Sequence, residues 1–582
     1  MFKAFIRNFT KSGRMSINIE DFNVVKEGRA TILAPKQDKV FYNHIQQFNR
    51  DLSVMAIKAW LEQYKTSKEG TKELRGKRRK LNKDESGETE QVTEGSKEES
   101  KEESKNEVSD APKETKDSKS EPSSDSTPFI RILEALSATG LRAIRYGHEI
   151  PNVSRIVAND LLAEAVKSIN RSAEYNGLQE KVVGHQGDAI KYMGSISDSE
   201  KFHAIDLDPY GTAAPFIDSA VQLVKDNGLL LVTCTDAGVL AGNGYPEKCF
   251  ALYGGNNFGN TDMGLEANHE AGIRLILGTI ASAAARYKKC IEPVLSLSID
   301  YYFRVFVRIT TSPIEVKKLA SNTMLAYHCV GCGHTVDQRL GRITDKKFQT
   351  PRIAQIPGEN CTYCERPYHL AGPMWGGQLH DQEFIDSVLA INSKASSEVY
   401  GTRERIKGML TLAKNELETP FYFNLNQLLS FMKAPPMAID DFAKAIGNLG
   451  YKVSLTHAKK NCVKTNAPWE SVLQVATAWL KKSNEKLVAE YQRKIEKEND
   501  EAKKEKLRQK IETLSKDLSN NPNLTSGMVG YKILETVAKA DVDFETVNAE
   551  SDKITKLRKL KMVRYQENPT KNWGPKSRPS NK

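Results

Sequence analysis

Short apolar runs alternate with amphipathic segments between residues 129 and 311, and this alternation predicts a doubly wound α/β fold. Each apolar run has the length of a buried strand, and the segment that follows it has the period of a helix. Five such runs occur in succession, at residues 129–136, 155–160, 181–188, 202–208 and 228–236. We therefore expect a mainly parallel sheet with helices on both faces.

Two further apolar runs complete this pattern. Residues 293–300 and 303–309 are separated only by Tyr301 and Tyr302, which predicts an antiparallel pair of strands. Five strands separated by helices, followed by such a pair, are the usual layout of a class I S-adenosylmethionine-dependent methyltransferase with a Rossmann-like sheet. An ordinary dinucleotide-binding fold is the alternative.

A long polar segment interrupts the chain before the first of these strands. Residues 63–127 are rich in Glu, Lys and Ser and contain almost nothing apolar. Such a segment cannot bury enough surface to offset the entropy of ordering it, so we expect a disordered insert. Within it, the basic cluster RGKRRKLNK at residues 75–83 indicates either a nuclear-localisation signal or a solvated run of charge.

Charge and cysteine content restrict the class of protein. The chain has 85 Lys and Arg against 74 Asp and Glu, a net charge of +11, which fits a polyanionic partner but also an ordinary basic protein. No run of eighteen apolar residues occurs, so we expect no membrane span. Eight cysteines in 582 residues favour reduced thiols and an intracellular location over a disulfide framework.

The N-terminal segment is basic throughout. Lys3, Arg7, Lys11 and Arg14 recur at three- and four-residue steps, and no acid precedes Glu20. A helix would place these basic residues along one face, as in a mitochondrial targeting segment. A frayed basic terminus is the alternative.

Acidic residues at the ends of the first three predicted strands indicate a nucleotide-type cofactor site. The first strand runs into the turn Ser137-Ala138-Thr139-Gly140, and Asp160 ends the second strand twenty residues after Gly140. An acid there can accept both ribose hydroxyls. The other candidates are Asp188 for an adenine amino group with the Ala189 amide nearby, Glu134 for the amino-acid part of S-adenosylmethionine, and Arg142 and Arg50 for its carboxylate. Structural ion pairs are the alternative interpretation of each.

The fourth predicted strand ends in DLDPYG, residues 206–211, where such folds place the methyl acceptor. Asp208 can accept an N–H bond from an exocyclic amine of a base and so free the nitrogen lone pair, while Pro209 fixes the backbone and Tyr210 can stack on the base. Asp206 lies on the same face of the strand as Asp208 but deeper, so it ranks second. A simple Asp-Pro turn is the alternative.

Two CxxC pairs predict a structural zinc site with four thiolate ligands. They consist of Cys329 with Cys332 and Cys361 with Cys364. A redox-active pair is the alternative. His328, His334 and His369 lie close in sequence and are less well placed as ligands.

The C-terminal third begins with two short helical patterns, a glycine turn and a strand at residues 421–469, typical of a winged-helix module. A charged helical pattern follows. From Lys553 to Lys582 there are ten basic residues and one acid, with Tyr565 and Trp573 among them. This composition suits binding to the phosphates and bases of a nucleic acid, and packing on the body is the alternative.

These patterns predict the following organisation of the chain. We expect a targeting segment at 1–19, a methyltransferase domain at 20–62 and 128–318 interrupted by the insert at 63–127, a zinc-binding module at 319–372, a winged-helix-like domain at 373–475, and a charged helix with a basic RNA-binding tail at 476–582.

Motifs throughout the chain resemble the tRNA guanine-26 N2-dimethyltransferase family in its eukaryotic, fungal form. They are FYNHIQQFNRDLS, EALSATGLRAIRY, VANDLL, DLDPYGT, TCTDAGVLAG, YPEKCFALYGG, the CxxC pairs, YHLAGPMW, SLTHAKKNCVKTNAPW and RYQENPTKNWGPK. The resemblance implies a tRNA substrate, S-adenosylmethionine as methyl donor and a structural zinc ion. The N-terminal segment and the basic cluster at 75–83 add the expectation of a mitochondrial and nuclear location. It assigns Asp208 as the catalytic acid, the four paired cysteines to zinc, and to the methyl donor the residues Arg50, Arg142, Asp160, Asp188 and Ala189.

Two other functions remain open from the sequence. One is an amino-methyltransferase that acts on adenine in RNA or DNA. The other is a zinc-dependent RNA-binding protein with an inactive methyltransferase fold. The complete set of Arg50, Asp160, Asp188 and Asp208 argues against an inactive fold.

Overall fold

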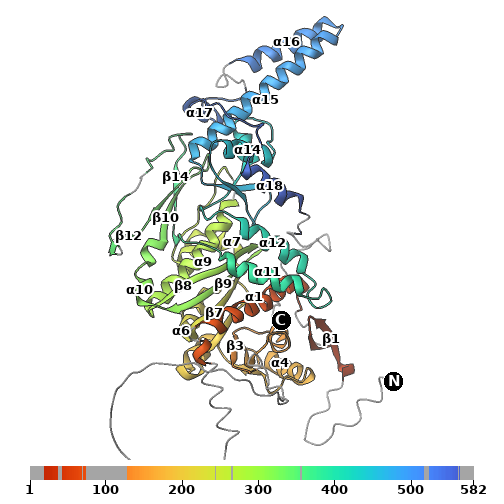
Figure 1. Ribbon diagram of the computed structural model, residues 1–582, viewed down its shortest axis with the longest axis vertical. Coiled ribbons are helices and arrows are strands. Elements are labelled where there is room, and N and C mark those ends of the chain that lie inside the picture. The colour runs from red at the N-terminus through yellow and green to blue at the C-terminus, as the bar shows by residue number, and fades with distance from the viewer. Residues whose placement is uncertain are drawn as a thin grey trace, which may run out of the picture.

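The computed structural model describes residues 19–36, 42–67, 70–73, 127–242, 244–263, 266–345, 347–353, 357–516, 523–560 and 563. The body is elongated, with the large sheet in the lower half of Figure 1 and the C-terminal helices at its upper end. The predicted targeting segment, the basic cluster with most of the insert, and the tail after Val563 lie outside the described residues.

A seven-stranded sheet forms the centre of the molecule and confirms the predicted fold class. Its order is β5-β4-β3-β6-β7-β9-β8, and β9 is antiparallel to both of its neighbours while the other pairs are parallel. The strands are β3 (Ile130–Glu134), β4 (Val153–Asp160), β5 (Val182–Gln186), β6 (Phe202–Leu207), β7 (Val224–Cys234), β8 (Lys289–Ile299) and β9 (Tyr302–Thr311). The order reverses between β3 and β6, which is where open α/β sheets bind ligands.

The period of two along the strands produces a core on each face of the sheet. In β6, Ala204 faces one core and Ile205 the other, and Leu229 and Leu230 of β7 do the same. The helices of the winding are α3 (Leu141–Glu149), α4 (Ala163–Tyr175), α5 (Ala189–Ser195), α6 (Ala214–Leu223) and α9 (Glu266–Arg286). The helices α7 (Ala237–Leu240), α8 (Pro246–Tyr253) and α10 (Pro313–Val316) are shorter.

Helix α1 (Gln47–Thr66) packs across the sheet, and its last turn includes the first residues of the predicted insert. The Trp60 indole donates to the Asn227 carbonyl at 3.1 Å. The ordered chain continues past the helix, because Glu73 accepts from Lys225 at 2.8 Å and lies 2.8 Å from His203. A hairpin of β1 (Phe22–Glu27) and β2 (Ala30–Pro35) packs on α3 and α4, and the 3-10 helix η2 (His44–Gln46) leads into α1.

A smaller sheet of order β11-β10-β14 follows the large one. Its strands are β10 (Thr323–Cys329), β11 (Thr335–Arg339) and β14 (Tyr368–Trp375), and a separate hairpin consists of β12 (Arg342–Thr344) and β13 (Lys347–Gln349). Helix α9 packs on β14 and thereby joins this module to the large sheet.

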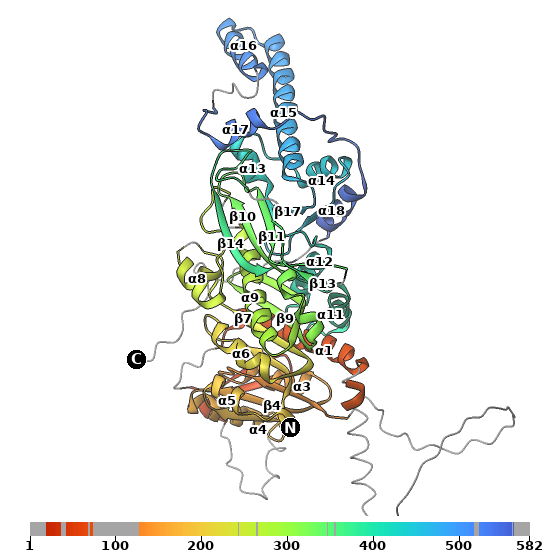
Figure 2. The same cartoon turned by 90° about the vertical axis from the view of Figure 1, so that its left-hand side faces the viewer.

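The C-terminal part begins with α11 (Gln382–Lys394) and α12 (Arg403–Asn415), which pack on α1. The winged-helix-like module consists of a sheet of order β15-β17-β16 and three helices. These elements are β15 (Phe423–Asn424), α13 (Leu425–Phe431), α14 (Ile439–Asn448), β16 (Val453–Leu455), β17 (Cys462–Thr465) and α15 (Trp469–Lys497). Helix α16 (Glu501–Ser515) pairs with the far end of α15 as an arm that projects from the body in Figures 1 and 2.

The last helices return to the winged-helix-like module. They are α17 (Val529–Thr536) and α18 (Ala549–Lys559). Ile554 and Leu557 of α18 are buried, and α18 packs on α14. The first residues of the basic C-terminal segment are therefore part of the folded body, as the alternative interpretation of that segment expects. No helix of the described ranges is long and apolar enough to cross a membrane.

Candidate active site

The acidic candidates lie together at one edge of the large sheet. Glu134 and Asp160 are the last residues of β3 and β4, Asp208 follows β6 directly, and Asp188 precedes α5. Because the carboxyl ends of parallel strands share one edge, the predicted strand-end acids line that edge. The register also places Glu134 beside Asp206 on the neighbouring strand.

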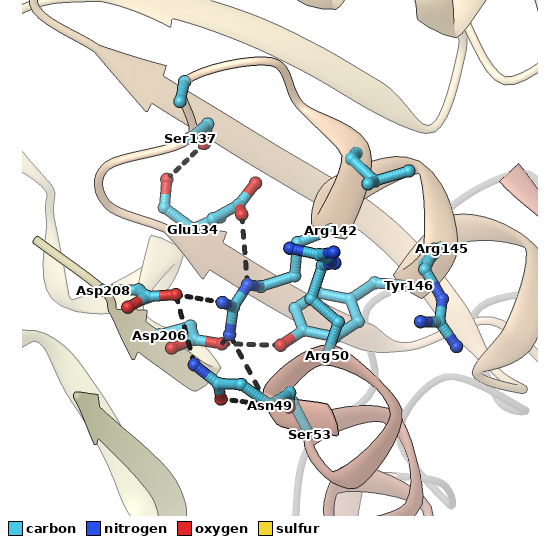
Figure 3. A network of polar contacts seen from close by, with 12 residues as sticks. Asn49, Arg50, Ser53, Glu134, Ser137, Arg142, Arg145, Tyr146, Asp206 and Asp208 are labelled. Atoms are coloured by element: carbon cyan, nitrogen blue, oxygen red, sulfur yellow. Dashed lines mark hydrogen bonds and ion pairs between the residues drawn. The ribbon is translucent and has the colours of Figure 1, made fainter. Parts of the chain in front are cut away.

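Arg142 joins three of these carboxylates (Figure 3). It lies in the first turn of α3, which starts after Gly140 at a φ of 74°. A side chain at Gly140 would lie 2.8 Å from Ile169, so the turn requires glycine both for its conformation and for space. The Arg142 guanidinium lies 2.9 Å from Asp206 and 3.5 Å from Glu134, and it also pairs directly with Asp208.

Asp206 is an anchor inside the sheet. Arg304 donates to both of its oxygens, at 2.8 and 3.0 Å, and the Tyr146 hydroxyl donates at 2.6 Å. Burial alone would raise the pKa of Asp206, but Arg142 and Arg304 outweigh it and the pKa is lowered. Asp206 is therefore a fully buried carboxylate whose oxygens are occupied by protein donors, and it holds Arg142 in place.

Asp208 lies at the rim, with a side chain 20% exposed. Its Oδ2 accepts hydrogen bonds from Arg142 and from the Asn49 amide, the latter at 3.4 Å. Within the ranges that the structure describes, its Oδ1 accepts no hydrogen bond. One carboxylate oxygen is thus fixed by the protein, and the other is available to a donor such as an amine.

The loop after Asp208 is fixed to the neighbouring strand end. The Gly211 amide donates to the Thr235 hydroxyl at 2.7 Å, and the Thr235 amide donates to the Gly211 carbonyl at 2.9 Å. Gly211 has a φ of 91°, which disfavours other residues. Tyr210, between these fixed points, is 51% exposed, so its ring is accessible to a base.

The other candidates for the methyl donor lie along the β4 and β5 ends of the edge. The Asp160 carboxylate accepts from the Ala138 and Leu162 amides, each at 2.9 Å. Asp188 caps α5 by accepting from the Ile190 and Lys191 amides at 2.9 and 3.0 Å, and Ala189 is buried behind it. Both acids therefore fix the backbone of the loops at this edge of the sheet through hydrogen bonds to its amides.

Arg50 lies on α1, next to Asn49 in sequence, and its guanidinium pairs with a different carboxylate. It donates to Glu27 of β1, with 2.6 Å from Nε to Oε1, and to the Asn43 carbonyl at 2.9 Å. Burial would raise the pKa of Glu27, but Arg50 and Arg145 lower it. The structure thus brings Glu134, Arg142 and Asp208 into one cluster, and it places Arg50 in an adjacent ion pair.

Five residues of this cluster were not predicted from the sequence: Asn49, Ser53, Tyr146, Thr233 and Arg304. Ser53 accepts from Arg304 at 2.7 Å and from Arg142 at 3.4 Å. Two signals were present. Arg304 is a charged residue inside an apolar strand, and Asn49 begins a run of three consecutive polar residues between Phe48 and Leu52.

Glu134 is the one acid of the cluster whose pKa is raised. It is 3% exposed, and its Oε2 has no hydrogen-bond partner in the described part of the chain. Burial is the main cause, against the attraction of Arg142, and it raises the pKa to about 8. Burial therefore favours the protonated form of Glu134 more than that of any other acid in the cluster.

The four paired cysteines form one buried cluster. The sulfurs of Cys329 and Cys364 are 3.4 Å apart, those of Cys332 and Cys361 are 3.7 Å apart, and all four lie within 4.8 Å of one another. Thiolates about 2.3 Å from a tetrahedral zinc ion are separated from each other by about 3.8 Å. The cluster therefore fits a zinc ion with no open position.

The nearby histidines have other partners. His334 contacts the Tyr368 hydroxyl, His328 the Thr335 hydroxyl and His369 the Phe258 carbonyl, each at 2.7 Å. Since these nitrogens are engaged elsewhere, the four cysteines complete the cluster without a histidine.

Comparisons with known proteins agree with this architecture. A family model described as N2,N2-dimethylguanosine tRNA methyltransferase matches residues 13–477. The chain is 47% identical to the mitochondrial tRNA (guanine(26)-N(2))-dimethyltransferase of Saccharomyces cerevisiae, over 98% of this chain and 95% of that protein. It is 42% identical to the tRNA (guanine(26)-N(2))-dimethyltransferase of Schizosaccharomyces pombe, over 95% of this chain and 92% of that protein.

A solved structure shares the fold. It is Trm1 from Pyrococcus horikoshii in complex with S-adenosyl-L-methionine, with a TM-score of 0.56 and 23% identity. The match covers 78% of this chain and 99% of that chain.

Proposed function

The chain belongs to the N2,N2-dimethylguanosine tRNA methyltransferase family, and from this membership we infer how its site works. The protein is an enzyme that transfers methyl groups to the exocyclic N2 of guanine 26 in tRNA and forms N2,N2-dimethylguanosine, with tRNA as its partner. The observation that carries the mechanism is the half-occupied carboxylate of Asp208 at the rim of the sheet.

Asp208 acts as the acceptor for the amine. The N2 lone pair of guanine is delocalised into the ring, so the amine is a poor nucleophile. A hydrogen bond from N2–H to Oδ1 of Asp208 favours a tetrahedral nitrogen and frees the lone pair, while Arg142 and Asn49 hold the carboxylate in place through Oδ2. Tyr210 stacks on the exposed face of the base.

S-adenosylmethionine supplies the methyl group. The buried Oε2 of Glu134, which lacks a partner in the described structure, fits the ammonium of its amino-acid part. In this proposal Asp160 binds the ribose hydroxyls, Asp188 the adenine amine, and the Ala189 amide lies beside Asp188. Arg142 and Arg50 pair with Glu134 and Glu27 in this structure, and in this proposal their positive charges also attract the carboxylate of the methyl donor.

A proton balance tests the role of Glu134. The pKa of Glu134 in the folded protein, about 8, exceeds its ordinary value of 4.5. Between these two pH values the folded state holds a proton that the unfolded state has lost. The contribution of Glu134 to stability is therefore lost as the pH rises through about 8. Pairing with an ammonium favours the ionised carboxylate. We expect S-adenosylmethionine binding near pH 6.5 to release about one proton per site, measured by calorimetry in buffers of different ionisation enthalpy.

Two controls accompany that measurement. Glu134→Gln should bind the methyl donor more weakly and release no proton. Methylthioadenosine, which lacks the amino-acid part, should release none from the wild type. Equal proton release by the wild type and Glu134→Gln would rule out the assignment.

The four cysteines hold a structural zinc ion in this proposal. Their closed geometry leaves no site for a substrate, so the metal would stabilise the module of β10, β11 and β14 and take no part in methyl transfer.

The location of the enzyme follows in part from its relatives. The name of the Saccharomyces cerevisiae relative includes the mitochondrion, which supports the targeting prediction for residues 1–19. The nuclear location rests on the basic cluster at 75–83 and remains a prediction. The proposed domain boundaries also remain predictions.

The basic C-terminal segment yields a prediction in two parts. Deleting residues 561–582 removes six basic residues after α18, so tRNA affinity should fall and its dependence on salt should become shallower, by up to about 0.9 in log–log slope for each lost phosphate contact. The melting temperature should not change.

Deleting residues 549–582 also removes the buried Ile554 and Leu557 and should lower the melting temperature. Binding across a salt series and a melting curve for both variants check this, and an unchanged salt slope in the shorter deletion would contradict phosphate contact.

Nucleoside mass spectrometry tests the function itself. A tRNA transcript incubated with the enzyme and S-adenosylmethionine should yield N2-methylguanosine and N2,N2-dimethylguanosine after digestion. Methylated adenosine instead would favour the adenine methyltransferase.

A further inference from the structure

Tyr302 lies on the same face of the sheet as Asp208, closer to the rim. Leu207 of β6 pairs with Val232 of β7, so the next residue, Asp208, is level with Thr233. Thr233 in turn pairs with Arg304 of β9. Asn49 contacts both Asp208 and Thr233, and Arg304 donates to Thr233, so these side chains share one face. Tyr302 precedes Arg304 by two residues and therefore shares this face too. Since β9 is antiparallel to β7, Tyr302 is one step nearer the catalytic edge.

The hydroxyl of Tyr302 is a buried donor without an acceptor. The residue is 6% exposed, and its oxygen has no hydrogen-bond partner in the described ranges. Burial raises the pKa of Tyr302, with Arg405, Asp300, Asp208 and Arg304 as the charged groups that act on it, so the hydroxyl stays protonated. Folded proteins rarely leave such a group unpaired, because its desolvation is then uncompensated.

The turn before Tyr302 is held from outside the sheet. Arg405 of α12 pairs with Asp300 at 2.7 Å, and its guanidinium lies over the Phe48 ring at 4.5 Å. Asp300 has a φ of 46°, and the backbone of Tyr302 pairs with Ile299. These contacts hold the backbone at the start of β9, and no acceptor among the described residues pairs with the Tyr302 hydroxyl, so we look for the acceptor in the substrate.

The position of Tyr302 in the sheet indicates which of the two substrates, methyl donor or methyl acceptor, its hydroxyl contacts. The acids proposed to bind the methyl donor, Glu134, Asp160 and Asp188, lie at the ends of β3, β4 and β5, on one side of β6. Tyr302 starts β9, on the other side of β6 and beyond β7. Its hydroxyl is therefore on the side of the methyl acceptor, together with Tyr210 and the exposed Tyr301.

Guanine offers one acceptor directly beside the reacting amine. N2 is flanked by N1, which carries a hydrogen, and by N3, which has a free lone pair. A phenol donor that approaches the amine from the side of Asp208 can pair with N3 but not with N1–H. We propose that the Tyr302 hydroxyl donates a hydrogen bond to N3 of the target guanine and so holds N2 against Oδ1 of Asp208. This inference rests on the proposed methylation of guanine N2.

Tyr302→Phe removes only this donor. We expect a loss of roughly 10- to 100-fold in kcat/KM for tRNA, the range for one hydrogen bond at a buried site. S-adenosylmethionine affinity should not change, and the melting temperature should stay the same or rise, because an unpaired buried hydroxyl is removed. Tyr422→Phe is the matched control: Tyr422 is 3% exposed and its hydroxyl also lacks a partner in the described structure, but it lies beside Glu270 and Cys462, away from Asp208. It should retain full activity.

A modified substrate identifies the atom. In a tRNA with 3-deazaguanosine at position 26, a C–H group replaces N3. The wild type should lose activity on this substrate by about the same factor as Tyr302→Phe loses on normal tRNA, and Tyr302→Phe should lose little more. Normal activity of Tyr302→Phe would overturn the inference, and so would fully additive losses. A wild type inactive on normal tRNA would instead refute the proposed function, so the two failures are distinguishable.

Discussion

Asp208→Ala should reduce methyl transfer by roughly 10²- to 10⁴-fold, the range for removal of a group that acts on a proton of the reacting atom. The variant loses Oδ1 of Asp208, a carboxylate oxygen that accepts no hydrogen bond from the described residues, while Oδ2 is engaged. S-adenosylmethionine and tRNA affinities should remain close to those of the wild type, because Asp206 still holds Arg142. Single-turnover kinetics with separate binding assays measures both effects.

Two variants sharpen this test. Asp208→Asn keeps the shape of the side chain and removes its charge, so it should retain tRNA binding and remain strongly impaired. Asp218→Ala removes a half-exposed acid of α6 outside the cluster and should be fully active. Near-normal turnover in Asp208→Ala would eliminate this residue as the amine acceptor.

Cys361→Ser should remove bound zinc and strongly destabilise the protein. Closed zinc sites contribute to folding directly, and the loss of a metal is one of the few single changes that cost more than about 4 kcal/mol. At roughly 2–4 °C per kcal/mol for a domain of 150–250 residues, the melting temperature of this part should fall by about 8–16 °C. Metal analysis beside scanning calorimetry measures both quantities.

Cys290→Ser is the control for this experiment. Cys290 is half-buried on β8, outside the cluster, and should keep both zinc content and stability. If Cys361→Ser does not fold, removal of metal from the wild type with a chelator gives the same comparison. A wild type purified without metal and unaffected by chelator would rule out a structural zinc ion.

The sheet could be predicted because its signals are local. Apolar runs of strand length, the turn at Gly140 and the DPY sequence after β6 each lie within a few residues of one another, and they located Asp160, Asp188 and Asp208 at strand ends. The two CxxC pairs were equally informative, because metal ligands of this kind occur at short, fixed spacings. The first residue of β7 could not be predicted from the local sequence, because Val224 belongs to the strand through its pairing with Phe202 of β6.

The partners inside the site could not be predicted, because they come from distant segments. Arg142 was expected to bind a carboxylate of the methyl donor, and the structure places it between three carboxylates of the protein. Arg304 meets Asp206 across 98 residues, and Asn49 reaches Asp208 across 159 residues that include the insert. Only the order of the strands and the packing of α1 across the sheet bring these groups together.

The most direct test of the central claim uses a change of one group in the substrate. A tRNA with inosine at position 26 lacks the exocyclic amine of guanine and is otherwise unchanged. With the wild-type enzyme and labelled S-adenosylmethionine, guanine-26 tRNA should take up about two methyl groups, and mass spectrometry should find N2,N2-dimethylguanosine at that position. The inosine-26 tRNA should bind and take up none, whereas equal methyl uptake by both tRNAs would contradict N2 of guanine 26 as the acceptor.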